Sequence, residues 1–129
     1  TPFDRNRTAW AGFAMSVGGR RVFFSGDSGY HAHFAVIGAR LAPFDAAFIP
    51  IGAYEPRWFM SAAHVNPDEA VRAHLDLRSR LSIAMHFGCF QLTDEAIDEP
   101  VRALARALEQ HGVPPATFRV LEPGETLAV

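Results

Sequence analysis

Residues 21–29, R-V-F-F-S-G-D-S-G, join an apolar run to a glycine-rich segment that ends it. The apolar run is typical of a buried strand, and the glycines are typical of a tight loop. Beyond the loop, residues 30–41 carry Phe34, Ile37 and Leu41 at helical spacing. Strand, loop and helix in this order form the basic unit of an α/β sheet.

The segment before this unit predicts a β-hairpin. Residues 9–17 are rich in apolar side chains, and Gly18-Gly19 separates them from a strand at 21–25. Glycine adopts the positive φ angles that a two-residue turn requires, so these two segments are expected to pair as neighbouring strands.

Further strands and helices follow along the chain. Short apolar runs at 46–51 and 81–86 are typical of buried strands. Asn66 can cap a helix that has Pro67 at its first position. The apolar side of this helix is predicted to consist of Ala70, Val71, His74, Leu75 and Leu77.

The last part of the chain predicts a helix followed by strands. Val101, Leu104, Ala105 and Leu108 give that helix its apolar side, and Gly112 ends it. Two closing strands, 118–121 and 126–129, are expected around a turn at Pro123-Gly124.

Three polar loops, 25–29, 52–66 and 86–93, each follow a predicted strand. In α/β sheets, functional loops gather at the carboxyl ends of the strands. We therefore expect an α/β fold in which these three loops open onto one crevice.

The composition is that of one globular domain. The 129 residues are 49% apolar and 20% charged, which argues against disorder. The formal charge of −2, without a basic run, argues against nucleic-acid binding. No apolar run reaches the ~20 residues of a membrane span, and no signal peptide is visible. The location stays open between secretion and the cytoplasm, with the cytoplasm slightly favoured. A single cysteine, Cys89, forms no internal disulfide, so packing, a partner or a metal must stabilise the chain.

Asp27, His64 and His86 are the candidate reactive residues. Asp27 follows a strand and is flanked by glycine-rich sequence, where its carboxylate could bind a metal or, equally, cap the next helix. His86 ends an apolar strand and is either a second ligand or an ordinary polar group. His64 lies just before the capped helix, near the expected crevice, or is a loop histidine without a role.

Other polar residues have weaker patterns. His31 and His33 have a spacing that suits zinc on a strand, but a helix is expected here. His74 is expected in the core or at its boundary, and His111 in the last turn of a helix. Cys89 has no base at a fixed offset to make it a nucleophile. Gly26–Gly29 could hold a phosphate, although the segment lacks a longer phosphate-binding motif.

Four segments together carry a family resemblance: F-F-S-G-D-S-G-Y (23–30), I-P-I-G-A-Y-E-P-R-W-F-M (49–60), H-V-N-P-D-E-A-V (64–71) and M-H-F-G-C-F (85–90). They resemble the C-terminal half of the metallo-β-lactamase superfamily, in the branch of N-acylphosphatidylethanolamine-hydrolysing phospholipase D and its bacterial relatives. The resemblance covers roughly residues 4–129. It implies that 1–129 form the C-terminal half of an αββα sandwich, with a mixed sheet and helices on one face.

The resemblance also implies roles for individual residues. Asp27 matches the carboxylate that bridges two zinc ions, His86 matches the last histidine ligand, and His64 matches a histidine near the substrate phosphate. Four further residues would shape the mouth of the substrate pocket: Tyr54, Glu55, Arg57 and Trp58. Arg57 either meets a phosphate or forms a loop salt bridge, since guanidinium suits both partners.

The family motif H-x-H-x-D-H is absent from this sequence. A catalytic zinc takes about three protein ligands, so this chain alone is expected to hold zinc weakly. Half a sandwich also leaves an apolar sheet face uncovered, with candidates among residues 10–17 and 22–24. The missing N-terminal half or a second copy would cover it.

Three functions therefore remain open from the sequence, the third being a phosphate-binding α/β domain that uses Gly26–Gly29. The first is a zinc-dependent phosphodiester hydrolase of phospholipase D type that is incomplete as this chain alone. The alternative is a catalytically silent assembly module that dimerises through its exposed sheet face.

Overall fold

The computed structural model describes residues 11–129, and its first element is the predicted hairpin. Strands β1 (Phe13–Val17) and β2 (Arg20–Phe24) pair antiparallel around the turn at Gly18 and Gly19. Trp10, the first residue of the predicted apolar segment 10–17, lies outside the described residues.

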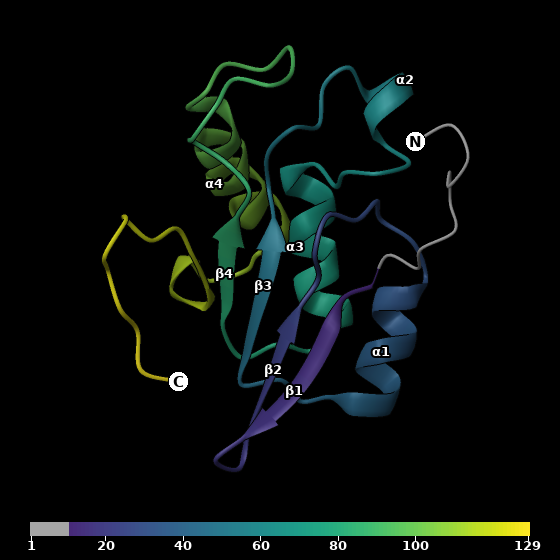
Figure 1. Ribbon diagram of the computed structural model, residues 1–129, viewed down its shortest axis with the longest axis vertical. Coiled ribbons are helices and arrows are strands. Elements are labelled where there is room, and N and C mark those ends of the chain that lie inside the picture. The colour runs from purple at the N-terminus through teal and green to yellow at the C-terminus, as the bar shows by residue number, and fades with distance from the viewer. Residues whose placement is uncertain (1–10) are drawn as a thin grey trace, which may run out of the picture.

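Three more strands extend the sheet from β2. They are β3 (Ala46–Pro50), β4 (Ser82–Met85) and β5 (Phe118–Arg119), and each pairs parallel with the strand before it. The strand order is β1-β2-β3-β4-β5 (Figure 1). The predicted α/β class with a mixed sheet is confirmed.

The prediction of two closing strands was wrong in part. Strand β5 has only two residues, and 126–129 form no strand. After β5, a turn closed by the N–H of Glu125 and the carbonyl of Glu122 carries the chain away from β4 (Figure 1). The last residues therefore have no neighbouring strand to pair with.

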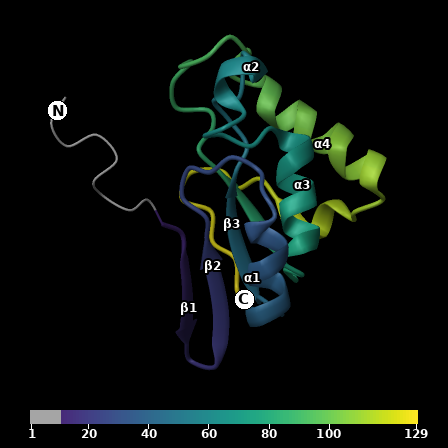
Figure 2. The same cartoon turned by 90° about the vertical axis from the view of Figure 1, so that its right-hand side faces the viewer.

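Helices α1 (His33–Leu41), α3 (Pro67–Asp76) and α4 (Glu99–His111) cover one face of the sheet (Figure 2). A short helix, α2 (Arg57–Met60), lies inside the predicted loop 52–66, and a 3-10 turn (Pro115–Thr117) precedes β5. None of the helices within residues 11–129 is long and apolar enough to cross a membrane.

The signals for the start of α3 and the end of α4 are confirmed. The side chain of Asn66 accepts a hydrogen bond from the N–H of Glu69, and the Glu69 carboxylate accepts one from the N–H of Asn66. This reciprocal capping box satisfies two N–H groups that the helix leaves unpaired. Helix α4 ends at Gly112, which has a left-handed conformation.

Helix α1 begins at His33 rather than near residue 30, and Ala32 occupies the capping position. Asp27 therefore does not cap this helix, which removes the structural alternative for its role. Residues 26–29 are also separated from the helix N-terminus, where backbone N–H groups would have favoured a phosphate.

The core lies between the sheet and its helices. Its largest fully buried side chains include Phe34, Phe44, Phe118, Ile49 and Leu104. Burial of each such side chain contributes roughly 1.5–3 kcal/mol. Leu75, predicted on the apolar side of α3, is exposed, because it lies at the margin of the buried face, about 100° or more around the helix from Ala70, His74 and Leu77. Ala105 of α4 is also exposed rather than buried.

The opposite face of the sheet carries apolar side chains that no other element within residues 11–129 covers. The register aligns Phe13 with Phe24, and Phe24 with Phe48, across three strands. Phe13 is 59% exposed and Val17 69% exposed. We call this surface the open sheet face: Phe13, Met15, Val17, Val22, Phe24 and Phe48. That the chain is half of a sandwich stays a prediction.

Candidate metal centre

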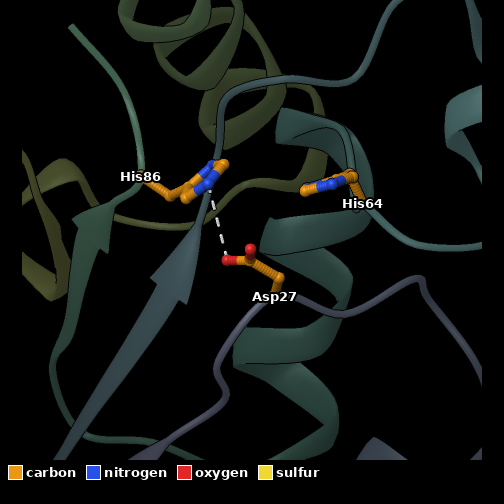
Figure 3. A group of neighbouring side chains, drawn as sticks. All are labelled: Asp27, His64 and His86. Carbon is orange, nitrogen blue, oxygen red and sulfur yellow. Dashed lines mark ion pairs between the residues drawn. The ribbon is translucent and has the colours of Figure 1, made fainter. Parts of the chain in front are cut away.

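The three predicted loops meet at one edge of the sheet. Strands β2, β3 and β4 are parallel neighbours, so their carboxyl ends lie side by side. Asp27 follows β2, His64 lies in the long connection after β3, and His86 follows β4 directly. The side chains of these three residues converge at this edge (Figure 3).

Their geometry suits a shared ion. His86 Nε2 lies 3.5 Å from Asp27 Oδ1, and the rings of His64 and His86 stack with centroids 5.3 Å apart. Each residue offers one ligand atom, and these atoms lie within 4.8 Å of one another. Tetrahedral ligands at about 2.0–2.2 Å from one zinc ion lie roughly 3.3–3.6 Å apart. The 3.5 Å between His86 Nε2 and Asp27 Oδ1 fits two ligands of one ion, and His64 lies beside that pair.

The backbone of His86 is strained. Its φ angle is +57°, in the left-handed region that residues with a side chain rarely adopt. Such conformations cost of the order of 1–3 kcal/mol and concentrate at functional sites. Gly52 permits it: a Cβ atom there would lie 2.3 Å from the His86 carbonyl oxygen. The backbone segments that follow β3 and β4 can approach this closely only if residue 52 is glycine.

The loops that carry Asp27 and His64 are held together through their backbones. The N–H of Val65 donates to the carbonyl of Ser28 over 2.8 Å. At Gly29, an added Cβ would lie 2.6 Å from the carbonyl oxygen of Ala62. This close approach places Asp27, whose side chain is 58% exposed, beside His64.

His64 has an unpaired nitrogen. Its Nδ1 is buried and has no hydrogen-bond partner in the part of the chain that the structure describes, residues 11–129. Such a group costs about 1–3 kcal/mol when left unpaired, so the site fits a metal ion or substrate that would bind it. Burial lowers the pKa of His64, while the nearby Asp27 carboxylate opposes that shift. A neutral imidazole is the form that binds metal.

The four residues expected at the pocket mouth occupy different environments. Tyr54 is buried, and burial together with Glu95 raises its pKa to about 12. The carboxylate of Glu55 accepts the backbone N–H of Arg57. Trp58 is 85% exposed.

The guanidinium of Arg57 is held by its own chain. It donates to the carbonyls of Tyr54 and His64 and pairs with Glu69 at 2.7 Å. The sequence left two partners open for Arg57, a phosphate or a salt bridge within the protein. The salt bridge is present.

The remaining histidines are not members of the cluster, although His31 and His33 line a second hollow together with Asp27. His33 Nε2 lies 3.4 Å from Ser28 Oγ, and the His31 ring is 6.2 Å from that of His33. His74 is buried as expected, with Nδ1 2.8 Å from Ser82 Oγ. His111, in the last turn of α4, pairs with Asp68. Cys89 is exposed.

Glu95 is a residue that sequence reasoning missed. Its carboxylate accepts the backbone N–H groups of Tyr54 and Glu55 and the hydroxyl of Thr93. No spacing in the sequence indicates this contact, because it joins positions about forty residues apart.

A cavity of about 210 Å³ opens beside His86. The segment after His86 and the start of α4 form it, and much of its lining is apolar: Ala53, Phe87, Phe90, Leu92, Ala96, Ile97 and Pro100. The candidate metal centre therefore borders a hollow that suits an apolar group.

Comparisons with known proteins identify the family of the chain. The sequence pattern of the β-lactamase superfamily domain matches residues 1–87. An N-acyl-phosphatidylethanolamine-hydrolyzing phospholipase D of Caenorhabditis elegans is 42% identical over 95% of this chain. A metal-dependent hydrolase of Deinococcus radiodurans is 33% identical over 89% of it.

A solved structure gives the same result. A metallo hydrolase of Ignicoccus hospitalis superposes with a TM-score of 0.67 over 95% of this chain, at 26% identity. The chain spans 35% of the nematode protein, 43% of the Deinococcus protein and 47% of the archaeal one. The chain belongs to the metallo-β-lactamase superfamily and is related to the N-acylphosphatidylethanolamine-hydrolysing phospholipases D and to bacterial metal-dependent hydrolases.

Proposed function

We propose that the protein containing this chain is a metal-dependent hydrolase of phospholipase D type that cleaves phosphodiesters. The observation that carries the proposal is the cluster of Asp27, His64 and His86, whose ligand atoms lie within 4.8 Å of one another. In this proposal Asp27 and His86 hold metal, and His64 acts at the substrate phosphate.

Zinc is the proposed metal. Imidazole nitrogen and carboxylate oxygen are both common zinc ligands. When bound, zinc ions polarise a phosphoryl oxygen and stabilise the negative charge that develops on it. The resemblance implies two ions, with Asp27 between them. The neutral His64 can donate one ring N–H to a phosphoryl oxygen, and its other nitrogen can accept a proton.

Residues 1–129 are proposed to be the C-terminal half of the domain. The relatives are two to three times longer than the part that this chain matches, and the open sheet face is exposed. The remaining zinc ligands and the covering layer would come from an N-terminal half or, failing that, from a second copy. The silent assembly module is not favoured, because the three candidate residues have come together at one edge.

The proposed substrate carries an apolar substituent. The cavity beside His86 has a largely apolar lining and borders the proposed zinc ligands, so such a substituent would lie within reach of the reacting phosphate. Trp58, together with Tyr54 and Glu55, is proposed to shape the approach to it. A lipid phosphodiester meets both requirements.

The test is hydrolysis of a series of phosphodiesters by the full-length gene product. We expect activity that is lost with a chelator and restored by zinc, and that increases with the length of the apolar substituent. Substituting His64→Ala should lower the rate, while Asp94→Ala, an exposed carboxylate in a neighbouring loop, should not. Activity that survives chelation, or an unchanged rate in the His64 variant, would contradict the proposal.

A further inference from the structure

The side chain of Arg57 connects three segments around His64. One terminal nitrogen, Nη1, donates to the His64 carbonyl over 2.9 Å and to the Tyr54 carbonyl over 3.3 Å. The other, Nη2, lies 2.7 Å from Glu69 Oε2. Both charged side chains are about three-quarters buried, with 27% and 21% exposed. Charge-assisted hydrogen bonds of this kind are stronger than neutral ones.

Glu69 joins this contact to the start of α3. The same oxygen that meets Arg57 also accepts the N–H of Asn66 over 2.9 Å. The Asn66 side chain in turn accepts the N–H of Glu69 over 2.8 Å. The capping box and the Arg57 guanidinium are therefore one hydrogen-bonded network.

The peptide groups on both sides of His64 are fixed by this arrangement. The His64 N–H donates to the Met60 carbonyl over 2.8 Å, and the N–H of Val65 donates to Ser28 over the same distance. Arg57 holds the carbonyl between these two N–H groups. By contrast, the ring nitrogen Nδ1 of His64 has no partner. Hydrogen bonds therefore fix the backbone of His64, while its ring is stacked against His86.

We infer that Arg57 and Glu69 are positioning residues for His64 and that Arg57 does not bind substrate. The inference rests on the proposed role of His64 in phosphodiester hydrolysis. Small displacements of a catalytic group slow a reaction steeply, whereas substrate binding changes little when the binding groups stay in place.

Kinetics of the zinc-loaded full-length protein separate positioning from substrate binding. For Arg57→Gln and for Glu69→Gln, we expect kcat to fall roughly 10- to 100-fold, with KM nearly unchanged. The double variant should be no slower than the slower single variant, because either change breaks the same network. Arg57→Lys should restore part of kcat. A rise in KM confined to the Arg57 variants would instead identify substrate binding and overturn the inference.

Arg80→Gln is the matched control. Arg80 also pairs with a carboxylate, Asp45, but at the opposite edge of the sheet. Its kcat and KM should equal those of the unsubstituted protein. A fall in kcat as large as in the Arg57 variant would show a general loss of structure rather than positioning.

Amide hydrogen exchange tests the inference without activity. In Arg57→Gln and Glu69→Gln, the amides of His64 and Val65 should exchange faster, and those of β3 should not. Unchanged protection of these two amides would overturn the inference even if the protein hydrolyses phosphodiesters. If hydrolysis fails while the amides respond as expected, it is the proposed function that fails.

Discussion

Two groups of polar side chains lie at opposite edges of the same sheet, and they differ in how well their hydrogen bonds are satisfied. At the amino edge, Asp45 accepts the N–H of Arg21 and pairs with Arg20 and Arg80. The Arg21 hydrogen bond, with the two cations, lowers the pKa of Asp45. At the carboxyl edge, Asp27 faces His86 at 3.5 Å, and His64 keeps a buried nitrogen without a partner. The satisfied group is structural, and the unsatisfied group has donors left for a ligand.

Replacing one carboxylate at each edge by alanine should give the largest difference in zinc content and hydrolysis rate. Asp27→Ala should remove bound zinc and lower the hydrolysis rate by about a thousandfold, because metal stabilisation of the transition state is worth several kcal/mol. Asp45→Ala should leave the zinc content unchanged and lower the midpoint of thermal unfolding. Elemental analysis and unfolding curves check both. Equal zinc content in the two variants would remove the distinction between the edges.

Two glycines allow a second contrast between the edges. Gly52→Ala should displace His86, because the added Cβ would lie 2.3 Å from its carbonyl oxygen. We expect zinc affinity to fall at least about tenfold, as when supporting residues of metal sites are changed. Gly18→Ala at the hairpin turn, with φ +56° and open space around it, should cost only about 1 kcal/mol. Zinc titration and denaturant unfolding measure these effects. If Gly52→Ala binds zinc as tightly as the unsubstituted protein, the position of His86 does not depend on Gly52.

Two histidines with lowered pKa values sharpen the comparison further. Burial lowers the pKa of both His64 and His74, but only His74 has a paired Nδ1, through Ser82. His74→Ala should reduce the free energy of unfolding by about 1–3 kcal/mol, since Ser82 loses its partner. His64→Ala should cost much less stability and much more activity. A His64 variant as destabilised as the His74 variant would identify His64 as structural.

The smallest expected effect is a pH dependence of stability. Folded His74 has a pKa below its unfolded value of 6.5, so the unfolded chain binds more protons as the pH falls. Its contribution to stability is intact above pH 6.5 and declines as the pH drops from 6.5 through the folded pKa. His74→Gln should show a shallower decline over this range in denaturant unfolding. If stability declines equally steeply with falling pH in the variant and in the unsubstituted protein, groups other than His74 cause the acid sensitivity.

Much of the fold follows from local sequence signals. The glycine pair at 18–19 predicted the hairpin, and Asn66 with Pro67 predicted the start of α3. The convergence of Asp27 and His86 was predictable because the ends of neighbouring parallel strands meet at one edge. The structure places both residues there, and their roles as ligands remain proposals.

The remainder depends on contacts that local patterns do not contain. The loop around Tyr54 is fixed by Glu95, which lies 41 residues away. The contact of Arg57 with the His64 carbonyl requires α2, which the sequence did not predict. The sequence also overestimated the closing strands, because a strand forms only where a partner is available.

The central claim is that Asp27 and His86 hold zinc at the carboxyl edge of the sheet. Anomalous diffraction at the zinc absorption edge, on crystals of the full-length protein, tests it directly. We expect a peak about 2.0–2.2 Å from an Asp27 oxygen and from a His86 nitrogen. A peak at His31 and His33 instead, or no peak in a protein that hydrolyses its substrate, would contradict the claim.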